Sequence, residues 1–173
     1  MEILEDRAAW DAAFRTGWLA HYERTGTIDF KQYNRPKNGT APGGPSVDLS
    51  RSRLVLISTA GGYVPITQEP FDAANPLGDY TIRLIPTGTP LSDIAYAHDH
   101  YDHTAVNADP QVLLPLGHLE ELVIEKQIGD LTSNVISFMG YQPDVGRVLD
   151  ELIPAIRTAV MAEGAQAALL VPS

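Results

Sequence analysis

Three histidines and two aspartates lie within one six-residue segment, His98-Asp-His-Tyr-Asp-His103. Imidazole and carboxylate groups packed this densely suit proton transfer, anion binding or metal ligation better than they suit a hydrophobic core. Five ionisable groups in six positions repel and compete with one another unless something uses them. A solvated polar turn is the structural alternative. We therefore take this segment as the candidate functional site.

Written as a pattern, the segment matches HxHxDH, and in this it resembles the metallo-β-lactamase superfamily. That resemblance implies a zinc hydrolase in which two or three of these residues hold zinc and the aspartate holds a second metal. The rest of the chain departs from the pattern, because that fold needs further histidine ligands much farther downstream. After His103 the only histidine is His118. We expect no metal site, and we keep the hydrolase as an alternative.

A second resemblance rests on the order of short blocks along the chain. An apolar run from Leu54 leads into the first of them, and the segment 78–86 follows before the histidines. The most specific blocks are Ser58-Thr-Ala-Gly61, His100-Tyr-Asp-His103 and Phe138-Met-Gly-Tyr141. Together, and in this order, they resemble the selenoprotein B family of glycine, sarcosine, betaine and D-proline reductases. The resemblance covers about residues 50 to 173.

Members of that family cleave a carbon–nitrogen bond reductively, and the resemblance implies a selenocysteine or cysteine nucleophile near the end of a late strand. This sequence departs from that pattern, since it contains no cysteine and stops at Ala167-Ala-Leu-Leu-Val-Pro-Ser173. A selenocysteine codon read as a stop would end a chain at such a point. We expect the nucleophile in a missing C-terminal part and no other cofactor in this chain. A natural terminal strand is the alternative.

The resemblance implies roles for individual residues. His100 and His103 are the candidates for holding the nucleophile as an anion or protonating the departing amine, with Asp102 orienting one ring. Tyr101 is a candidate donor to a substrate carboxylate. We expect catalysis by His100, His103 and Asp102, and substrate binding by Ser58, Thr59, Gly61, His98, Tyr101, Met139 and Tyr141.

Composition narrows the range of ligands and partners. The net charge of −10 and the pI near 4.7 argue against nucleic acid and anionic membrane surfaces, because either needs a basic face. A small zwitterionic or cationic substrate fits better. Candidate protein partners are a thiol-reductant protein and a second copy of the chain. The absence of cysteine excludes disulfides and cysteine-rich zinc sites, and the sequence shows neither a signal peptide nor a membrane span, so we expect a cytoplasmic protein.

The elements alternate as in an α/β fold. The sequence predicts an N-terminal helix that ends at Thr25-Gly26-Thr27, then a Pro- and Gly-rich loop over residues 34–50. Further along we expect helices over 116–127 and after Asp144, the latter kinked at Pro154 and ended by Gly164. Predicted strands cover residues 53–58, 94–97, 134–138 and 166–171.

Strands separated by helices predict a single α/β domain with a mainly parallel sheet flanked by helices, plus an N-terminal helical arm. The arm with its loop covers residues 1–50, and the reductase-like domain, expected to be truncated at its C-terminus, covers 51–173. The histidine segment would follow a strand at the sheet edge where such folds build sites. The Thr59-Ala-Gly-Gly62 stretch predicts a tight turn rather than phosphate binding, because it lacks a nucleotide-binding spacing.

A non-catalytic member of the same fold is the remaining alternative. Such a subunit would bind a small molecule after losing the redox group. The gene region after Ser173 distinguishes the enzyme from the binding subunit. An in-frame TGA followed by a cysteine-containing extension supports the enzyme. An ordinary stop codon without such an extension supports the binding subunit.

Overall fold

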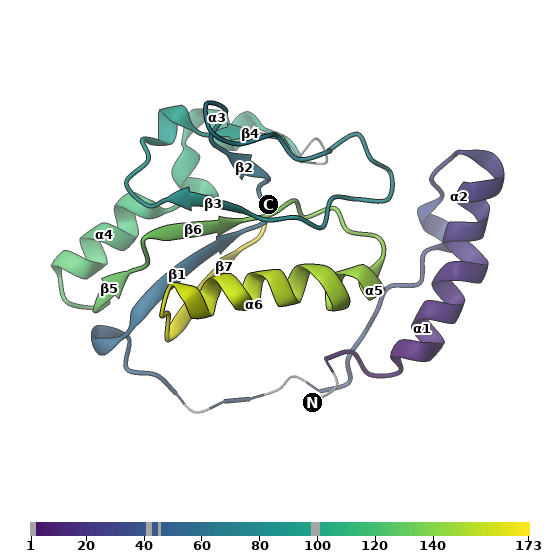
Figure 1. The fold of residues 1–173 in the computed structure, drawn as a ribbon, viewed down its shortest axis with the longest axis horizontal. Coiled ribbons are helices and arrows are strands. Elements are labelled where there is room, and N and C mark those ends of the chain that lie inside the picture. Colours follow the sequence, from purple (N-terminus) through teal and green to yellow (C-terminus); the bar gives the residue numbers. More distant parts are fainter. Residues whose placement is uncertain (1–2, 41–42, 45, 98–100) are drawn as a thin grey trace.

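The computed structural model of the 173-residue chain describes residues 3–40, 43–44, 46–97 and 101–173. A helical N-terminal arm stands beside an α/β body, and a long connection joins the two (Figure 1). In the described part of the chain, no helix is long and apolar enough to cross a membrane.

The arm is one helical stretch, as the sequence predicts, and it ends where Gly26 takes a left-handed φ of 67°. Trp10, Phe14 and Trp18 are buried on one side and stack in series, with ring centroids 5.0 and 5.5 Å apart. Val145 and Leu149 of the body pack against them. The stretch consists of α1 (Arg7–Phe14), a π-helical segment (Arg15–Leu19) and α2 (Ala20–Thr25).

The main sheet is built around β1 (Arg53–Ser58), a strand buried along all but its first residue. β1 pairs in parallel with β7 (Ala167–Val171) on one side, and with β5 (Asp130–Leu131) and β6 (Asn134–Ser137) on the other. β3 (Arg83–Pro86) adds an antiparallel edge on β6. The predicted α/β class with a mainly parallel sheet is therefore confirmed.

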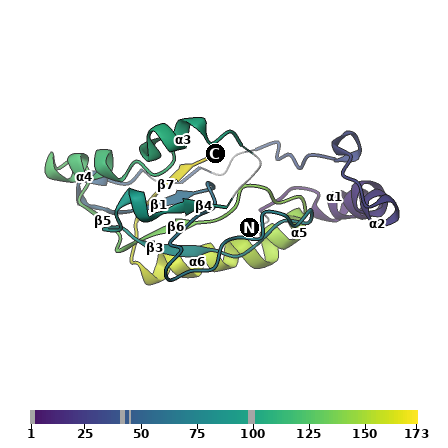
Figure 2. The same cartoon turned by 90° about the horizontal axis from the view of Figure 1, so that it is seen from above.

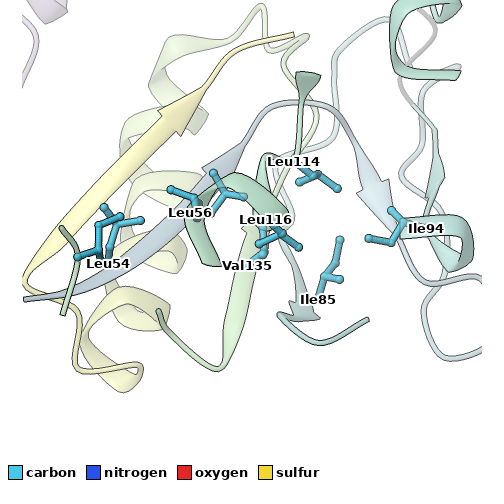
Figure 3. Close-up of a cluster of buried hydrophobic side chains, with 9 residues drawn as sticks. Leu54, Leu56, Ile85, Ile94, Leu114, Leu116 and Val135 are labelled. Carbon is cyan, nitrogen blue, oxygen red and sulfur yellow. The ribbon is translucent and has the colours of Figure 1, made fainter. Parts of the chain in front are cut away.

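Helices cover both faces of this sheet. Figure 2 shows α4 (Leu116–Ile124) on one side and α6 (Ile153–Ala162) on the other. The alternation along β1 explains this arrangement, because successive side chains of a strand point to opposite faces. Leu54 and Leu56 join the cluster on the α4 side (Figure 3), while Val55 and Ile57 pack against residues of α6.

One predicted strand belongs to a different sheet. Residues 94–97 were expected in the parallel sheet, but β4 (Ala95–Tyr96) pairs antiparallel with β2 (Gly62–Tyr63) in a separate two-stranded ribbon. The prediction was wrong in the pairing because an apolar run of this length fits a ribbon as well as a central strand. The ribbon still brings Ala97, the residue directly after β4, to Gly61 in the turn that follows β1.

Two helix predictions need correction. The helix predicted over residues 116–127 ends at Ile124, and Lys126 takes a φ of 62°. After Asp144, whose side chain accepts the Arg147 N–H, the chain forms α5 (Val145–Arg147), a π-helical segment (Val148–Leu152) and then α6. Pro154 sits in the first turn of α6, where a missing N–H is tolerated. The irregularity is thus the π-helical segment before Pro154, and Gly164 ends the helix as predicted.

The remaining elements are short. Helix α3 (Thr104–Ala108) follows the histidine segment directly. The 3-10 turns are Phe30–Gln32, Leu49–Arg51, Leu91–Asp93 and Pro110–Val112.

Candidate functional site

The carboxyl ends of β1 and β6 run into two segments that bind each other through their main chains. The N–H of Gly61 donates to the carbonyl of Phe138 at 3.0 Å, and the N–H of Gly140 donates to the carbonyl of Thr59 at 3.0 Å. Gly61 has a φ of 66°, a left-handed conformation that a side chain would strain. The predicted tight turn is therefore present, and it lies against the Met139 segment.

The end of β7 lies against the same turn. The N–H of Ser173 donates to Oγ1 of Thr59 at 2.8 Å, and the Ser173 hydroxyl lies 3.0 Å from that Oγ1. The N–H of Thr59 donates in turn to the carbonyl of Val171 at 3.1 Å. Figure 1 shows the C-terminal residue at the carboxyl ends of the neighbouring strands. Thr59 thus fixes the position of the chain where β7 ends.

The candidate histidine segment lies only partly within the described residues, since His98, Asp99 and His100 fall outside them. The residues on either side of this gap both bind the turn after β1. The N–H of Ala97 donates to the carbonyl of Gly61 at 3.0 Å, and the Tyr101 hydroxyl donates to the carbonyl of Ala60 at 3.2 Å. The expected convergence of the segment with the turn holds for these flanking residues.

His103 is a half-buried imidazole beside aromatic rings. Its ring centroid lies 4.5 Å from that of Tyr101 and 6.5 Å from that of Tyr96, the latter in an edge-on arrangement. Burial raises the pKa of both tyrosines to about 12, so each phenol stays neutral and able to donate near neutral pH. The imidazole therefore sits among neutral hydrogen-bond donors that also restrict its access to water.

Asp102 is exposed and binds the start of α3. Its Oδ1 accepts the Thr104 hydroxyl at 2.7 Å and the Thr104 N–H at 2.9 Å. The bond from the Thr104 hydroxyl is the larger cause, and the bond from the Thr104 N–H the smaller, of a pKa of the Asp102 carboxyl below its usual range. The carboxylate is therefore ionised at neutral pH and holds the turn that leads into α3. Its role in orienting a histidine ring stays a prediction.

The other predicted binding residues differ in their access to solvent. Ser58 and Met139 are fully buried, so they pack beneath the carboxyl edge of the sheet and are not open to a ligand from solvent. The Tyr141 hydroxyl donates to the carbonyl of Pro76 at 3.0 Å, and its ring meets Phe30 edge-on at 6.3 Å. The described members with accessible side chains are Thr59, Tyr101, His103 and Tyr141, which are partly accessible, and Asp102, which is exposed.

Tyr96 was not singled out by the sequence, although its ring lies beside His103. Its hydroxyl is buried and has no hydrogen-bond partner among the described residues. The Ser137 hydroxyl, at the end of β6, is in the same condition. The short distance along the chain from Tyr96 to the histidines was the one signal that could have found it.

A half-open apolar cavity of about 470 Å³ lies beside this edge on the α6 face. Its walls include Ile57, Phe138, Ile156 and Leu170, with Arg157 at the rim. Within the described ranges, no group of three or more metal-binding side chains is arranged to hold an ion. His98 and His100 lie outside those ranges.

The sequence was compared with known families and proteins. The sequence model of the glycine/sarcosine/betaine reductase selenoprotein B family matches residues 30–172. D-proline reductase subunit gamma of Acetoanaerobium sticklandii is 31% identical over 123 residues, which cover 71% of this chain and 49% of that protein. Sarcosine reductase complex component B subunit beta of Peptoclostridium acidaminophilum is 29% identical over 118 residues, 66% of this chain and 27% of that protein. The chain thus spans half or less of the length of these relatives, and no solved structure matches it.

Proposed function

We propose, from the premise that this chain belongs to the glycine/sarcosine/betaine reductase selenoprotein B family, that it is a subunit of an amino-acid reductase complex and binds a small zwitterionic or cationic substrate. Both relatives are named as reductase subunits, which supports assembly with other proteins. The net charge of −10 favours a ligand with a positive group. The substrate would lie at the carboxyl edge of the sheet.

One observation carries this proposal. The end of β7 is bonded to Thr59, and the next residue of the same turn, Ala60, accepts the hydroxyl of Tyr101, whose ring touches His103. A nucleophile that follows β7 would therefore emerge next to an imidazole. Reductive cleavage needs a nucleophile and a proton donor. Both would be positioned by the same short turn after β1.

In the proposed reaction a selenolate or thiolate attacks the carbon that carries the amine. The new carbon–selenium or carbon–sulfur bond forms as the carbon–nitrogen bond breaks, and the nitrogen leaves with the electron pair and takes a proton. His103 or His100 would give that proton or hold the nucleophile as an anion. A thiol-reductant protein would supply the two electrons of the reduction. To donate its one hydroxyl hydrogen to the substrate carboxylate, Tyr101 would exchange its bond to the Ala60 carbonyl for one to the substrate.

The 173 residues contain no cysteine, so the nucleophile in this proposal comes from outside them. Sequencing the gene beyond the Ser173 codon tests this point. An in-frame TGA followed by a cysteine-containing extension supports the enzyme. An ordinary stop without such an extension favours the second candidate, a subunit that binds the substrate without turning it over.

Calorimetric titration with glycine, sarcosine, betaine and D-proline tests the binding part. We expect at least one of these compounds to bind, and the variants His100→Ala, His103→Ala and Asp102→Asn to bind it more weakly. The amide oxygen of Asn can still accept the Thr104 N–H, and the substitution removes the charge. His118→Ala is the matched control, because this exposed imidazole on α4 has a single ion-pair contact, with Glu121 at 3.8 Å.

Melting temperatures show whether the histidine segment serves ligand binding or the stability of the fold. We expect each variant to melt within a few degrees of the wild type, because the proposal assigns these polar side chains to ligand binding and not to the packing of the core. A large loss of stability with binding unchanged would identify the segment as a structural network. Failure of all four compounds to bind would refute the proposed substrate class.

A further inference from the structure

Residues 139–144 lead from the carboxyl end of β6 to α5, and two other parts of the chain hold them in place. The first is the stretch 76–80, where the Tyr80 hydroxyl accepts the N–H of Asp144 at 2.8 Å. The segment matters for the candidate site because its Gly140 is bonded to the turn after β1. Whatever fixes residues 139–144 therefore also fixes this edge of the sheet.

The second support is the N-terminal arm, which lies beside α5 (Figure 1). The Tyr33 hydroxyl donates to the carbonyl of Pro143 at 2.9 Å, a bond between residues 110 positions apart. Burial raises the pKa of Tyr33 to about 12, so the phenol is neutral and able to donate at neutral pH. Phe30 meets the ring of Tyr141 edge-on at 6.3 Å. The arm thus contacts the segment 139–144 at two neighbouring points.

The helix of the arm fixes the ring of Tyr33. Trp10, Phe14 and Trp18 each meet this ring edge-on, with centroids 6.5, 6.3 and 6.1 Å away. Edge-to-face pairs of aromatic rings are stabilising beyond the apolar area that they bury. Trp10 also donates its Nε1–H to the carbonyl of Asn34 at 2.7 Å, which holds the main chain next to Tyr33. The helix therefore sets the position from which the Tyr33 hydroxyl reaches the body.

This helix lies outside the part of the chain that the family model matches. The match begins at residue 30, so Phe30 and Tyr33 fall within it, whereas the helical stretch 7–25 precedes it. The residues that contact the segment 139–144 thus belong to the family match, and the rings that order Tyr33 come from outside it.

We propose that Tyr33 is a positioning residue for the candidate site: through its bond to Pro143, the arm holds residues 139–144 against the turn after β1. The bond that this support keeps in place runs from the N–H of Gly140 to the carbonyl of Thr59, at 3.0 Å. The inference rests on the proposed function in that a ligand is taken to lie at this edge. The support itself can be tested separately from the ligand.

Hydrogen exchange followed by NMR tests the support without a ligand. Tyr33→Phe removes the hydroxyl and keeps the ring among the aromatic rings of the arm. The loss of one hydrogen bond should let the Gly140 amide open locally and exchange about fivefold faster. Ser52→Ala is the stability control, because it also removes one hydrogen bond, from the Ser52 hydroxyl to the carbonyl of Asp48 at 2.7 Å, at the other end of β1. In this control Gly140 should keep its rate.

Two further variants separate this bond from the general packing of the arm. Phe30→Leu changes a ring that is 59% exposed, so it leaves the core intact and should also speed the exchange of Gly140. Tyr22→Phe is the matched control for the loss of a phenol hydroxyl. The Tyr22 ring stacks on Trp18, and its hydroxyl makes no hydrogen bond within the described ranges. Tyr22→Phe should therefore leave the exchange of Gly140 unchanged.

Calorimetry adds a readout at the ligand. For a compound that binds the wild type, Tyr33→Phe should weaken binding about two- to fivefold, since the effect cannot exceed the free energy of the bond that is lost. Unchanged affinity would overturn the proposal. Equal exchange of Gly140 in Tyr33→Phe and Ser52→Ala would overturn it as well, because the bond would then contribute stability alone. If none of the four compounds binds while Gly140 exchanges faster in Tyr33→Phe than in Ser52→Ala, the proposed substrate class fails and the positioning role stands.

Discussion

Ser137→Ala is predicted to stabilise the protein, although it removes a hydroxyl group from the end of a central strand. Ser58 and Ser137 are partners in the register of β1 and β6, and both are fully buried. Ser58 Oγ accepts the N–H of Ala60 at 3.3 Å, whereas Ser137 Oγ has no partner among the residues that the structure describes. Ser137 Oγ borders Gly62 in an apolar environment.

The magnitude follows from this difference between the two serines. A buried hydroxyl without a partner costs about 1–3 kcal/mol of desolvation. After allowing for lost packing contacts of the oxygen, we expect Ser137→Ala to raise the free energy of unfolding by about 1 kcal/mol. For a chain of this size that corresponds to about 2–4 °C in melting temperature. Ser58→Ala should have the opposite sign and cost about 1 kcal/mol, because it leaves the N–H of Ala60 unpaired.

Urea unfolding followed by circular dichroism measures both variants under the same conditions. The dependence of the free energy on urea should stay unchanged, so that a shift in the midpoint reports stability alone. A fall of 1 kcal/mol or more in the free energy of unfolding of Ser137→Ala, as expected for Ser58→Ala, would refute this reasoning. It would mean that the Ser137 hydroxyl has a hydrogen-bond partner, such as a bound water molecule.

Three further predictions concern backbone strain, alkaline stability and metal. Gly78→Ala should cost about 2–4 kcal/mol in thermal unfolding, because Gly78 has a φ of 83° and an added Cβ would lie 2.8 Å from a backbone oxygen; Gly88→Ala, with open space around it, should change stability little. Burial raises the pKa of Tyr96 to about 12, so its stabilising contribution is complete below its unfolded pKa of about 10 and is lost as pH rises towards 12; Tyr96→Phe should reduce this alkaline loss in urea titrations. Protein purified without chelator should contain no stoichiometric zinc by elemental analysis, and one or two zinc atoms per chain that disappear in the His100→Ala, His103→Ala double variant would favour the hydrolase chemistry instead.

Local sequence patterns predicted the buried strand and two of the helix ends well, but they placed the end of α4 three residues too late. The continuous apolar run of residues 53–58 matches β1, and Gly26 and Gly164 mark the predicted helix ends. β3 was missed because only Ile85 of its four residues is buried, so the strand has no strong periodic pattern. The pairing of β4 was predicted wrongly because strand partners are set by contacts between distant residues.

The candidate site shows the same limit. The types and spacing of the histidines and aspartates indicate a functional segment, and that role stays a prediction. The expectation that this segment follows a strand of the parallel sheet was wrong, because β4 belongs to the separate ribbon. The contact from the Tyr101 hydroxyl to the Ala60 carbonyl depends on the packing of a ribbon against the sheet, which no local pattern encodes. The bond from the Thr104 N–H to the Asp102 carboxylate, by contrast, is local, and the spacing of the two residues could have indicated it.

The pairing of β1 with β7 has a consequence for how the chain folds. Leu54 pairs with Ala167, although the two residues lie far apart in the sequence. Forming this contact closes a long loop of the chain, and this loop closure has a large cost in chain entropy. During synthesis the backbone groups of β1 that pair with β7 stay unpaired until β7 has left the ribosome. We therefore expect the sheet to assemble first from β1, β5 and β6, with β7 docking late.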